Sequence, residues 1–138
     1  MIPKFKAWDK VSHAWIYDIY IGLDGRAKDL SRTGEEPFEL NLDNVIIIQS
    51  AGLLDVNGEE IFEGDVVAST WFKDYYNLVG YRKLGKVIYR NGCFCIEYPG
   101  DVERRYPPTI LNFAIDVEII GNIFENPELM EVGDDTEV

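Results

Sequence analysis

The segment from Gly85 to Tyr98 constrains the fold more than any other part of the sequence. Two runs of strand-forming residues flank Asn91-Gly92, a dipeptide typical of the two-residue turn that joins antiparallel strands. With a loop of two residues, the cross-strand pairs are Arg90–Cys93, Tyr89–Phe94, Ile88–Cys95, Val87–Ile96 and Lys86–Glu97. Side chains alternate between the faces of a strand, and the expected core face carries Tyr89, Val87, Phe94, Ile96 and Tyr98. The opposite face brings Lys86 and Glu97 together as a favourable charge pair.

A second hairpin is predicted near the N-terminus. Alternation predicts one strand face that carries Trp15, Tyr17, Ile19, Ile21 and Leu23. Asp24-Gly25 then predicts a two-residue turn, and residues 26–30 form the returning strand. Residues 31–44 are polar and rich in turn formers, which indicates a loop, whereas 45–49 is a β-branched run suited to a buried strand.

Helix signals are sparse. Asn126-Pro127-Glu128 predicts the start of a short helix, with Asn as the cap, Pro in the first turn and an acid at the positive end of the helix dipole. The predicted fold class is therefore mainly β: antiparallel hairpins that form a small, partly open SH3-like barrel, with an N-terminal β-hairpin region and a short C-terminal helix. We predict one mainly-β domain over 1–126, or two subdomains over 1–50 and 51–126, followed by a short helix and acidic tail over 127–138.

Charge is distributed unevenly along the chain, whose net charge is −12. The last fourteen residues hold no Lys or Arg and six acids: Glu125, Glu128, Glu131, Asp134, Asp135 and Glu137. We interpret this segment as a solubilising tail; the alternative is an acidic segment that docks on a basic partner or mimics DNA.

The N-terminus lacks the apolar region of a secretory signal, and the longest apolar run is far too short for a membrane span. We expect a cytoplasmic protein of a bacterial host cell, without membrane contact.

Residues 71–90 reverse the acidic trend, since five cations and one acid give this segment a net charge of +4. Aromatic residues lie among the cations, a combination that can stack on bases and bind phosphates. The candidate binding surface consists of Trp71, Tyr75, Tyr76, Tyr81, Arg82, Lys83, Lys86 and Arg90. The alternative interpretation is that the aromatic residues belong to the core.

The stretch from Gln49 to Val67 is predicted to contain two turns followed by the entry to a strand. Gly52 and Asn57-Gly58 supply residues suited to positive φ, and Asp55 is placed to form an Asx turn with the backbone two residues on. Residues 61–67 are predicted to form a turn that delivers the chain into a strand.

Three blocks of the sequence are informative together: Phe-Lys-Ala-Trp-Asp at 5–9, the stretch 49–67, and Val-Glu-Ile-Ile-Gly-Asn-Ile-Phe-Glu-Asn-Pro-Glu-Leu at 117–129. In their order and spacing they resemble the YopX-like family, found largely in bacteriophages, prophages and other mobile elements. The middle block is close to the family pattern Q-x-T-G-L-x-D-x-x-G-x-x-[IV]-[YF]-x-G-D, although Ala51 replaces its Thr and Leu54 its common polar residue. The resemblance implies a fold and a mobile-element origin, and it implies no activity. Residues 117–120 would be a strand that leads through Gly121-Asn122 to the helix. We interpret the motif residues as structural: Gly52, Asp55, Asn57, Gly58, Gly64, Asp65, Gly121 and Asn122.

The residues that most often act in catalysis or bind metals do not occur in this sequence in the patterns typical of catalytic or metal sites. His13 is the single histidine and is expected on the surface of a polar turn. Cys93 and Cys95 share a strand face about 7 Å apart, beyond comfortable disulfide geometry, and are expected to be two reduced thiols. The segment from Asp55 to Glu63 resembles a calcium loop but lacks its required ligand and glycine. We therefore expect no cofactor, no resident metal and no catalytic residue.

Three functions remain open. The leading hypothesis is a non-enzymatic accessory protein of a phage or mobile element that binds a host or phage protein, since acidic proteins favour basic protein partners. A homo-oligomer is also expected because the many aromatic residues can leave an apolar face to bury. The alternatives are a nucleic-acid-binding module that uses residues 71–90, and a carboxylate- or metal-dependent enzyme. For the enzyme no catalytic residue is predicted, and Asp55, Asn57, Glu63 and Asp65 are the residues to test because they lie together in the motif block.

Overall fold

The computed structural model describes residues 4–30, 38–72, 76 and 79–130. Contacts between Cα atoms divide the chain into two compact units, Met1–Ser50 and Ala51–Val138. The prediction of a single domain over 1–126 stays a prediction, as does its alternative of two subdomains. None of the helices in the described part of the chain has the length and hydrophobicity needed to cross a membrane.

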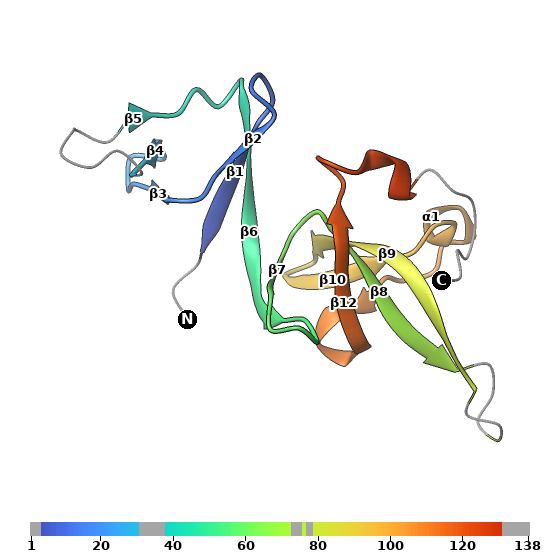
Figure 1. Ribbon diagram of the computed structural model, residues 1–138. Coiled ribbons are helices and arrows are strands. Elements are labelled where there is room, and N and C mark those ends of the chain that lie inside the picture. Colours follow the sequence, from blue (N-terminus) through green and yellow to red (C-terminus); the bar gives the residue numbers. More distant parts are fainter. Residues whose placement is uncertain (1–3, 31–37, 73–75, 77–78, 131–138) are drawn as a thin grey trace. The chain divides into compact units, whose positions relative to one another are not determined.

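The N-terminal unit is built from short antiparallel strands (Figure 1). They are β1 (Phe5–Asp9), β2 (Ala14–Ile16), β3 (Ile19–Ile21), β4 (Ala27–Asp29), β5 (Phe38–Glu39) and the first half of β6 (Val45–Leu54). Strand β1 lies between β2 and β6, and β4 lies between β3 and β5. The buried core of this unit consists of Ala7, Ala27, Leu40 and Val45, with Ile16, Ile19 and Ile47 packed against it. The predicted strand over 45–49 is confirmed and continues to Leu54.

The predicted first hairpin is wrong in two respects. The expected single strand over 15–23 is divided, because β2 pairs with β1 whereas β3 pairs with β4. Its alternating side chains therefore share no single core face, and Tyr17 is 65% exposed. The turn is also longer than two residues: the N–H of Gly22 donates to the carbonyl of Arg26, which leaves three residues in the loop, with Gly25 at φ 81°.

The predicted loop over 31–44 is only partly described. Residues 31–37 lie outside the described residues. Phe38 and Glu39 form β5, which pairs with β4, so the expectation of a continuous loop is wrong here. The polar residues that follow do form a turn, closed by the N–H of Asn44 donating to the carbonyl of Asn41.

The C-terminal unit contains a five-stranded antiparallel sheet that curls into a half-barrel (Figure 1). Its strand order is β11 (Thr109–Ile110), β10 (Cys93–Glu97), β9 (Gly80–Arg90), β8 (Asp65–Phe72), β12 (Ile115–Asn122). The second half of β6 lies beside β7 (Glu60–Phe62), and the 3₁₀ helix η1 (Leu111–Phe113) links β11 to β12. The predicted mainly-β class is confirmed.

The hairpin from β9 to β10 has the predicted register at all five cross-strand pairs. Asn91 and Gly92 both adopt positive φ, as a two-residue primed turn requires. Val87, Ile96 and Tyr98 are buried on the predicted core face, whereas Tyr89 is 52% exposed, so its assignment to the core is wrong. Tyr89 lies next to the turn and contacts Phe94 edge to face. On the other face, Lys86 Nζ lies 3.6 Å from Glu97 Oε1, as expected.

Both faces of the curled sheet carry buried side chains. The larger cluster contains Ile61, Val67, Val87, Ile96, Tyr98, Leu111 and Val117. The smaller cluster contains Val66, Ala68 and Leu84, covered by Ile123, Leu129 and Met130. Because neighbouring residues of β8 point to opposite faces, Val66 and Val67 are both fully buried. The C-terminal segment therefore forms a structural layer of this unit.

Two helical features differ from the sequence-based expectation. The helix α1 (Asp101–Arg104) has no clear sequence signal and was not expected. The predicted C-terminal helix is a single 3₁₀ turn, η2 (Pro127–Met130). The side-chain oxygen of Asn126, expected to cap this helix, instead accepts a hydrogen bond from the N–H of Asn122 at 3.3 Å.

Candidate functional site

The predicted binding surface over residues 71–90 is divided between two faces of the sheet. Arg82, Lys86 and Arg90 alternate on one face of β9, and Tyr81 and Lys83 lie on the other. Trp71 pairs with Tyr81 across the strands. Tyr76 is 96% exposed, and Tyr75 lies outside the described residues. The structure therefore brings together two smaller groups of these side chains.

Arg82 is held by the protein itself. Its Nη1 donates to Thr70 Oγ1 at 2.9 Å and to the carbonyl oxygen of Asp116 at 2.5 Å, and its Nη2 lies 3.6 Å from Glu118 Oε1. Thr70 belongs to β8 and the two acids to β12. Arg82 therefore links three neighbouring strands, and its guanidinium is largely occupied by these contacts.

Lys83 lies beside a buried polar network. Its ammonium is 4.4 Å from the ring centroid of Tyr98 and 5.1 Å from that of Trp71, within cation–π range. The hydroxyl of Tyr98 lies 2.6 Å from Ser69 Oγ and accepts a hydrogen bond from Trp71 Nε1 at 3.0 Å. Ser69 is fully buried. These contacts place Trp71 in the packing of the core, which was the alternative interpretation of the aromatic residues.

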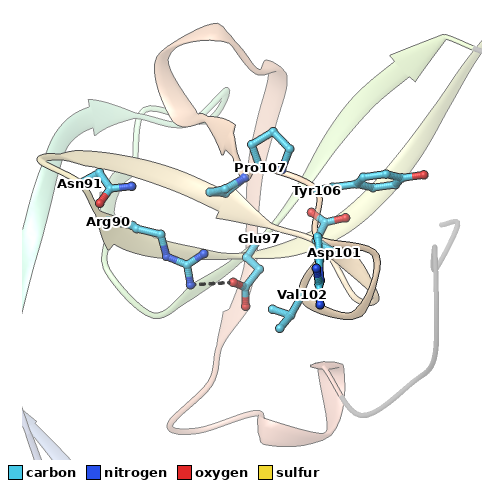
Figure 2. Close-up of a pocket in the computed structure, with 9 residues that line it drawn as sticks. Arg90, Asn91, Glu97, Asp101, Val102, Tyr106 and Pro107 are labelled. Carbon is cyan, nitrogen blue, oxygen red and sulfur yellow. Dashed lines mark hydrogen bonds and ion pairs between the residues drawn. The ribbon is translucent and has the colours of Figure 1, made fainter.

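A cleft lies between the β9–β10 hairpin and the segment that contains α1 (Figure 2). Its volume is about 400 Å³, and its lining residues are Arg90, Asn91, Glu97, Asp101, Val102, Arg105, Tyr106, Pro107 and Pro108. Of the members of the predicted binding surface that the structure describes, Arg90 alone lines the cleft. We take this cleft as the candidate functional site.

Local backbone geometry shapes the side of the cleft formed by residues 100–108. Gly100 and Arg105 both have positive φ, at the two ends of α1. A carboxylate oxygen of Asp101 accepts the N–H of Tyr98 at 3.1 Å, and its carbonyl accepts the N–H of Tyr106 at 2.9 Å. Pro107 and Pro108 follow and cannot continue a helix. The loop is thus fixed by hydrogen bonds to Asp101 at both of its ends.

The charges of the cleft are partly compensated. Arg90 Nη2 donates to Glu97 Oε2 at 3.1 Å, and Lys86 approaches the other oxygen of the same carboxylate. Glu97 is thus neutralised by two cations, and Asp101 is engaged with the backbone. Arg105 adds a further positive charge beside the apolar surface of Val102, Tyr106, Pro107 and Pro108. The arrangement suits a ligand that has both a carboxylate and an apolar group.

Sequence reasoning missed most of this cleft. Arg90, Asn91 and Glu97 belong to the predicted hairpin, whereas the other lining residues come from one helical turn and a Pro-Pro segment, neither of which has a periodic signal. Gly100-Asp101 and Pro107-Pro108 predict turns, but only the curl of the sheet places them beside Arg90. The available sequence signal for the cleft was therefore the group of turn-forming residues that follows the β9–β10 hairpin directly.

Asp55, in the middle motif block, has a buried carboxylate whose two oxygens both accept hydrogen bonds. Its Oδ1 accepts the N–H groups of Asn57 and Glu59, each at 2.9 Å, which includes the expected Asx turn. Its Oδ2 accepts the N–H of Ile119 at 3.0 Å. Burial raises the pKa of Asp55, but the three backbone donors outweigh burial and hold that pKa below its usual value.

The glycines and asparagine of this block differ in their roles. Gly52 has φ 73° but lies inside β6, so the expected first turn is wrong. Gly58 has φ 81° as expected, whereas Asn57 is not among the residues with positive φ. Gly64, at φ 89°, donates to Val87 and accepts from Ile123, and an added Cβ would lie 2.6 Å from the ring of Phe124. Gly64 thus allows the last block to approach closely.

The remaining motif residues connect the second and third blocks. Asp65 pairs with Asn122 across β8 and β12, and its Oδ2 accepts the N–H of Phe62 at 2.8 Å. Asn122 Oδ1 accepts the N–H groups of Phe124 and Glu125. The expected strand over 117–120 is confirmed within β12, which also includes Gly121 and Asn122. Asp55, Asp65 and Asn122 all have side-chain oxygens bound by backbone donors.

The cysteines and the histidine have simple surroundings. Cys93 and Cys95 are free thiols, and their sulfur atoms lie 3.5 Å apart. Burial and the neighbouring Cys93 thiol raise the pKa of Cys95. His13 is exposed in a turn as expected, with φ 55°, and its ring stacks on Trp8 at 5.9 Å between centroids.

Together these features define a class of small mainly-β proteins with a curled antiparallel sheet stabilised by a buried aspartate. The chain belongs to the YopX protein family, whose family model matches residues 4–131. It is similar to the crystal structure of protein EF1440 from Enterococcus faecalis, with a TM-score of 0.61 and 27% sequence identity over 95% of this chain and 99% of that chain. No curated protein matches the chain. The family resemblance seen in the sequence is confirmed.

Proposed function

We propose that the chain is a non-enzymatic accessory protein of a phage or other mobile element, which acts in the host cytoplasm by binding a host or phage protein. The observation that supports this proposal is the cleft between the β9–β10 hairpin and α1. The cleft combines apolar surface with two arginines, a composition typical of sites that hold a peptide side chain and an adjacent carboxylate.

The acidic character of the whole chain and the two arginines of the cleft act over different distances. The net charge of −12 disfavours distant polyanions and favours basic proteins during encounter. Charges are screened beyond about 8 Å at physiological salt, so contacts inside the cleft depend on its own charged side chains. These are Arg90, which is paired with Glu97, Asp101, which accepts a backbone N–H, and Arg105. We therefore propose a partner that presents a short acidic and apolar segment to the cleft, whatever its overall charge.

The proposal is tested by tagged pull-down from host lysate with and without nuclease. Arg105→Glu and Val102→Asp alter the cationic and apolar parts of the cleft at exposed positions. Lys10→Glu makes the same charge change as Arg105→Glu at an exposed residue of the N-terminal unit. We expect a nuclease-resistant protein to be captured by the wild type and by Lys10→Glu, and at least about tenfold less by either cleft variant. Equal capture by all four proteins, or no captured protein, would contradict the proposal.

The nucleic-acid alternative has less structural support. Arg82 contacts Thr70, Asp116 and Glu118, and Lys83 contacts two aromatic rings, so a polyanion would have to displace contacts within the protein. Oligonucleotide binding that weakens steeply with salt and is lost in Arg82→Glu would favour this alternative. The enzyme alternative has less support as well, because backbone N–H groups bind the carboxylates of Asp55 and Asp65.

Self-association is a further part of the proposal. Aromatic and aliphatic side chains are exposed on the C-terminal unit at Tyr89, Tyr106, Phe113 and Ile115. Light scattering coupled to size exclusion measures the mass of the particle directly. A monomeric mass at all protein concentrations would contradict self-association and would not affect the proposal that the cleft binds a partner.

A further inference from the structure

Cys93 and Cys95 form a pair of thiols at the start of β10, next to the Asn91-Gly92 turn. Their side chains share one face of the strand, and their sulfur atoms lie 3.5 Å apart, although neither forms a disulfide. Cys93 is partly exposed, whereas Cys95 is 3% exposed. The two thiols are therefore one cluster, with an accessible member and a buried member.

The geometry of this pair suits a small bridging atom. With metal–sulfur bonds of about 2.3 Å, sulfurs 3.5 Å apart subtend an angle of about 100° at the bridging atom. Such an angle is typical of pyramidal three-coordinate centres and far from the linear arrangement of two-coordinate ions. A direct disulfide would need a much shorter S–S distance and a closer approach of two residues in extended backbone.

The number of protein ligands near the two thiols also restricts which kinds of atom could bind there. Within the described residues, no group of three or more His, Cys, Asp or Glu side chains is placed to hold a metal ion. A zinc site needs about four ligands, so two thiols alone provide half of one. Thiolates prefer soft metal and metalloid atoms. A soft trivalent atom that already carries one substituent needs only two thiolates to complete three-fold coordination.

We propose that Cys93 and Cys95 form a dithiol site for trivalent arsenic species, represented by arsenite and monosubstituted organoarsenicals. With phenylarsine oxide, two S–As bonds form while the As=O bond and two S–H bonds break, and the oxygen leaves with both protons as one water molecule. Arsenic stays trivalent, and no electrons are transferred.

Access to the site follows from its place in the hairpin. Cys93 is the first residue of β10 and is partly exposed, so an arsenical can bond to it first. Cys95 then lies within reach, because its sulfur is already in contact with that of Cys93. Closing the second bond requires little change in the backbone.

The test uses phenylarsine oxide with the reduced full-length protein, read by intact-mass spectrometry under native conditions. The variants are Cys93→Ser and Cys95→Ser, with circular dichroism to verify folding. We expect one adduct per wild-type chain, removed by excess ethanedithiol, and at least about a hundredfold weaker retention in either variant. If Cys95→Ser fails to fold, Cys93→Ser at the partly exposed position carries the test alone.

Two controls decide between this site and general thiol reactivity. Zinc added to the wild-type protein is expected to bind no more tightly than zinc added to a variant that combines Cys93→Ser with Cys95→Ser. Iodoacetamide labelling in urea verifies that both thiols are reduced and reactive. The proposal is overturned if the adduct is equally stable in Cys93→Ser, or if the wild-type adduct forms only after unfolding.

Discussion

The carboxylate of Asp55 accepts a hydrogen bond from the backbone N–H of Ile119, a residue 64 positions further along the chain. The same carboxylate also closes the turn at residues 55–59, so one side chain joins the second motif block to the third. A strand edge leaves backbone groups unpaired, and β12 is an edge strand of the curled sheet. Asp55 therefore occupies one donor at that edge, and the N–H of Val56 pairs with the carbonyl of Val117 beside it.

Replacing Asp55 by Asn is expected to destabilise the protein by about 3 kcal/mol. The amide cannot accept all three backbone hydrogen bonds, because one of its two polar atoms is a donor. Urea unfolding measures the change in the free energy of unfolding. Asp116→Asn is the matched control at an exposed aspartate, with an expected change within about 0.5 kcal/mol. Equal effects of the two substitutions would contradict this role for Asp55.

The lowered pKa of Asp55 predicts a specific loss of stability in acid. Its usual pKa is 3.8, and in the folded protein it is lower because the backbone donors outweigh burial. The stabilisation is therefore complete above pH 3.8 and is lost as the pH falls through the lower folded-state pKa. Urea unfolding of wild type and Asp55→Asn from pH 7 to pH 3 should show a difference that shrinks only at the acidic end. A difference independent of pH would be inconsistent with this linkage.

Tyr98→Phe should lower stability by about 1–2 kcal/mol because it removes the hydroxyl that contacts Ser69 and Trp71. Ser69 would remain buried with this partner lost. Thermal unfolding followed by circular dichroism measures the change in stability. Tyr106→Phe, at a residue 60% exposed, is the control and should change stability little. A Tyr98→Phe variant as stable as this control would rule out an energetic role for the network.

Gly121→Ala is expected to destabilise the C-terminal unit by about 1–3 kcal/mol through overpacking. The new methyl group would lie 2.5 Å from Asn126 Oδ1 and 3.0 Å from Leu129 Cδ1, where the last motif block folds over β12. Gly80→Ala is the matched control, since its methyl group comes no closer than 3.3 Å to Thr70 Cγ2. Hydrogen exchange localises the effect: faster exchange at residues 122–130 in Gly121→Ala alone supports the packing argument, and uniform exchange in both variants does not.

Cys93 should react with iodoacetamide at least about tenfold faster than Cys95 at pH 8. The buried thiol of Cys95 has a pKa raised above its usual value of 9.0, so little of it is thiolate at this pH. Its reaction rate should therefore keep rising as the pH increases through 9. Peptide mass spectrometry after timed labelling measures both sites, and labelling in urea should bring the two rates together. Equal rates in the folded protein would contradict the burial of Cys95.

Part of the fold could be read from the sequence, because the signals are local. Asn91-Gly92 fixes a two-residue loop, and alternation then fixes the partners of all ten strand residues considered. Asp24-Gly25 is a similar signal, yet it predicted the wrong loop. In that segment the alternating residues over 15–23 belong to two strands, of which one pairs with β1 and the other with β4. The alternation therefore did not determine how the residues on the two sides of Asp24-Gly25 pair.

The candidate site was predictable only in fragments. Arg82 and Lys83 are adjacent in the sequence, but neighbouring residues of a strand point to opposite faces, so they join different groups. Tyr89 has the correct alternation for the core and is exposed because burial also depends on what covers the sheet at that point. A binding surface predicted only from the residue types of a segment takes no account of which face a side chain lies on or of what covers that face.

The sequence by itself determined the mainly-β class, the register of the β9–β10 hairpin and the family to which the chain belongs. Each follows from residues close together or from motifs in a fixed order. The tertiary structure alone decided that Asp55 holds Ile119, that Arg82 contacts β12, and that Arg90 and Arg105 line one cleft. These contacts join residues distant in the chain, and they exist only because the curled sheet and its bulged edge strand bring the distant segments together.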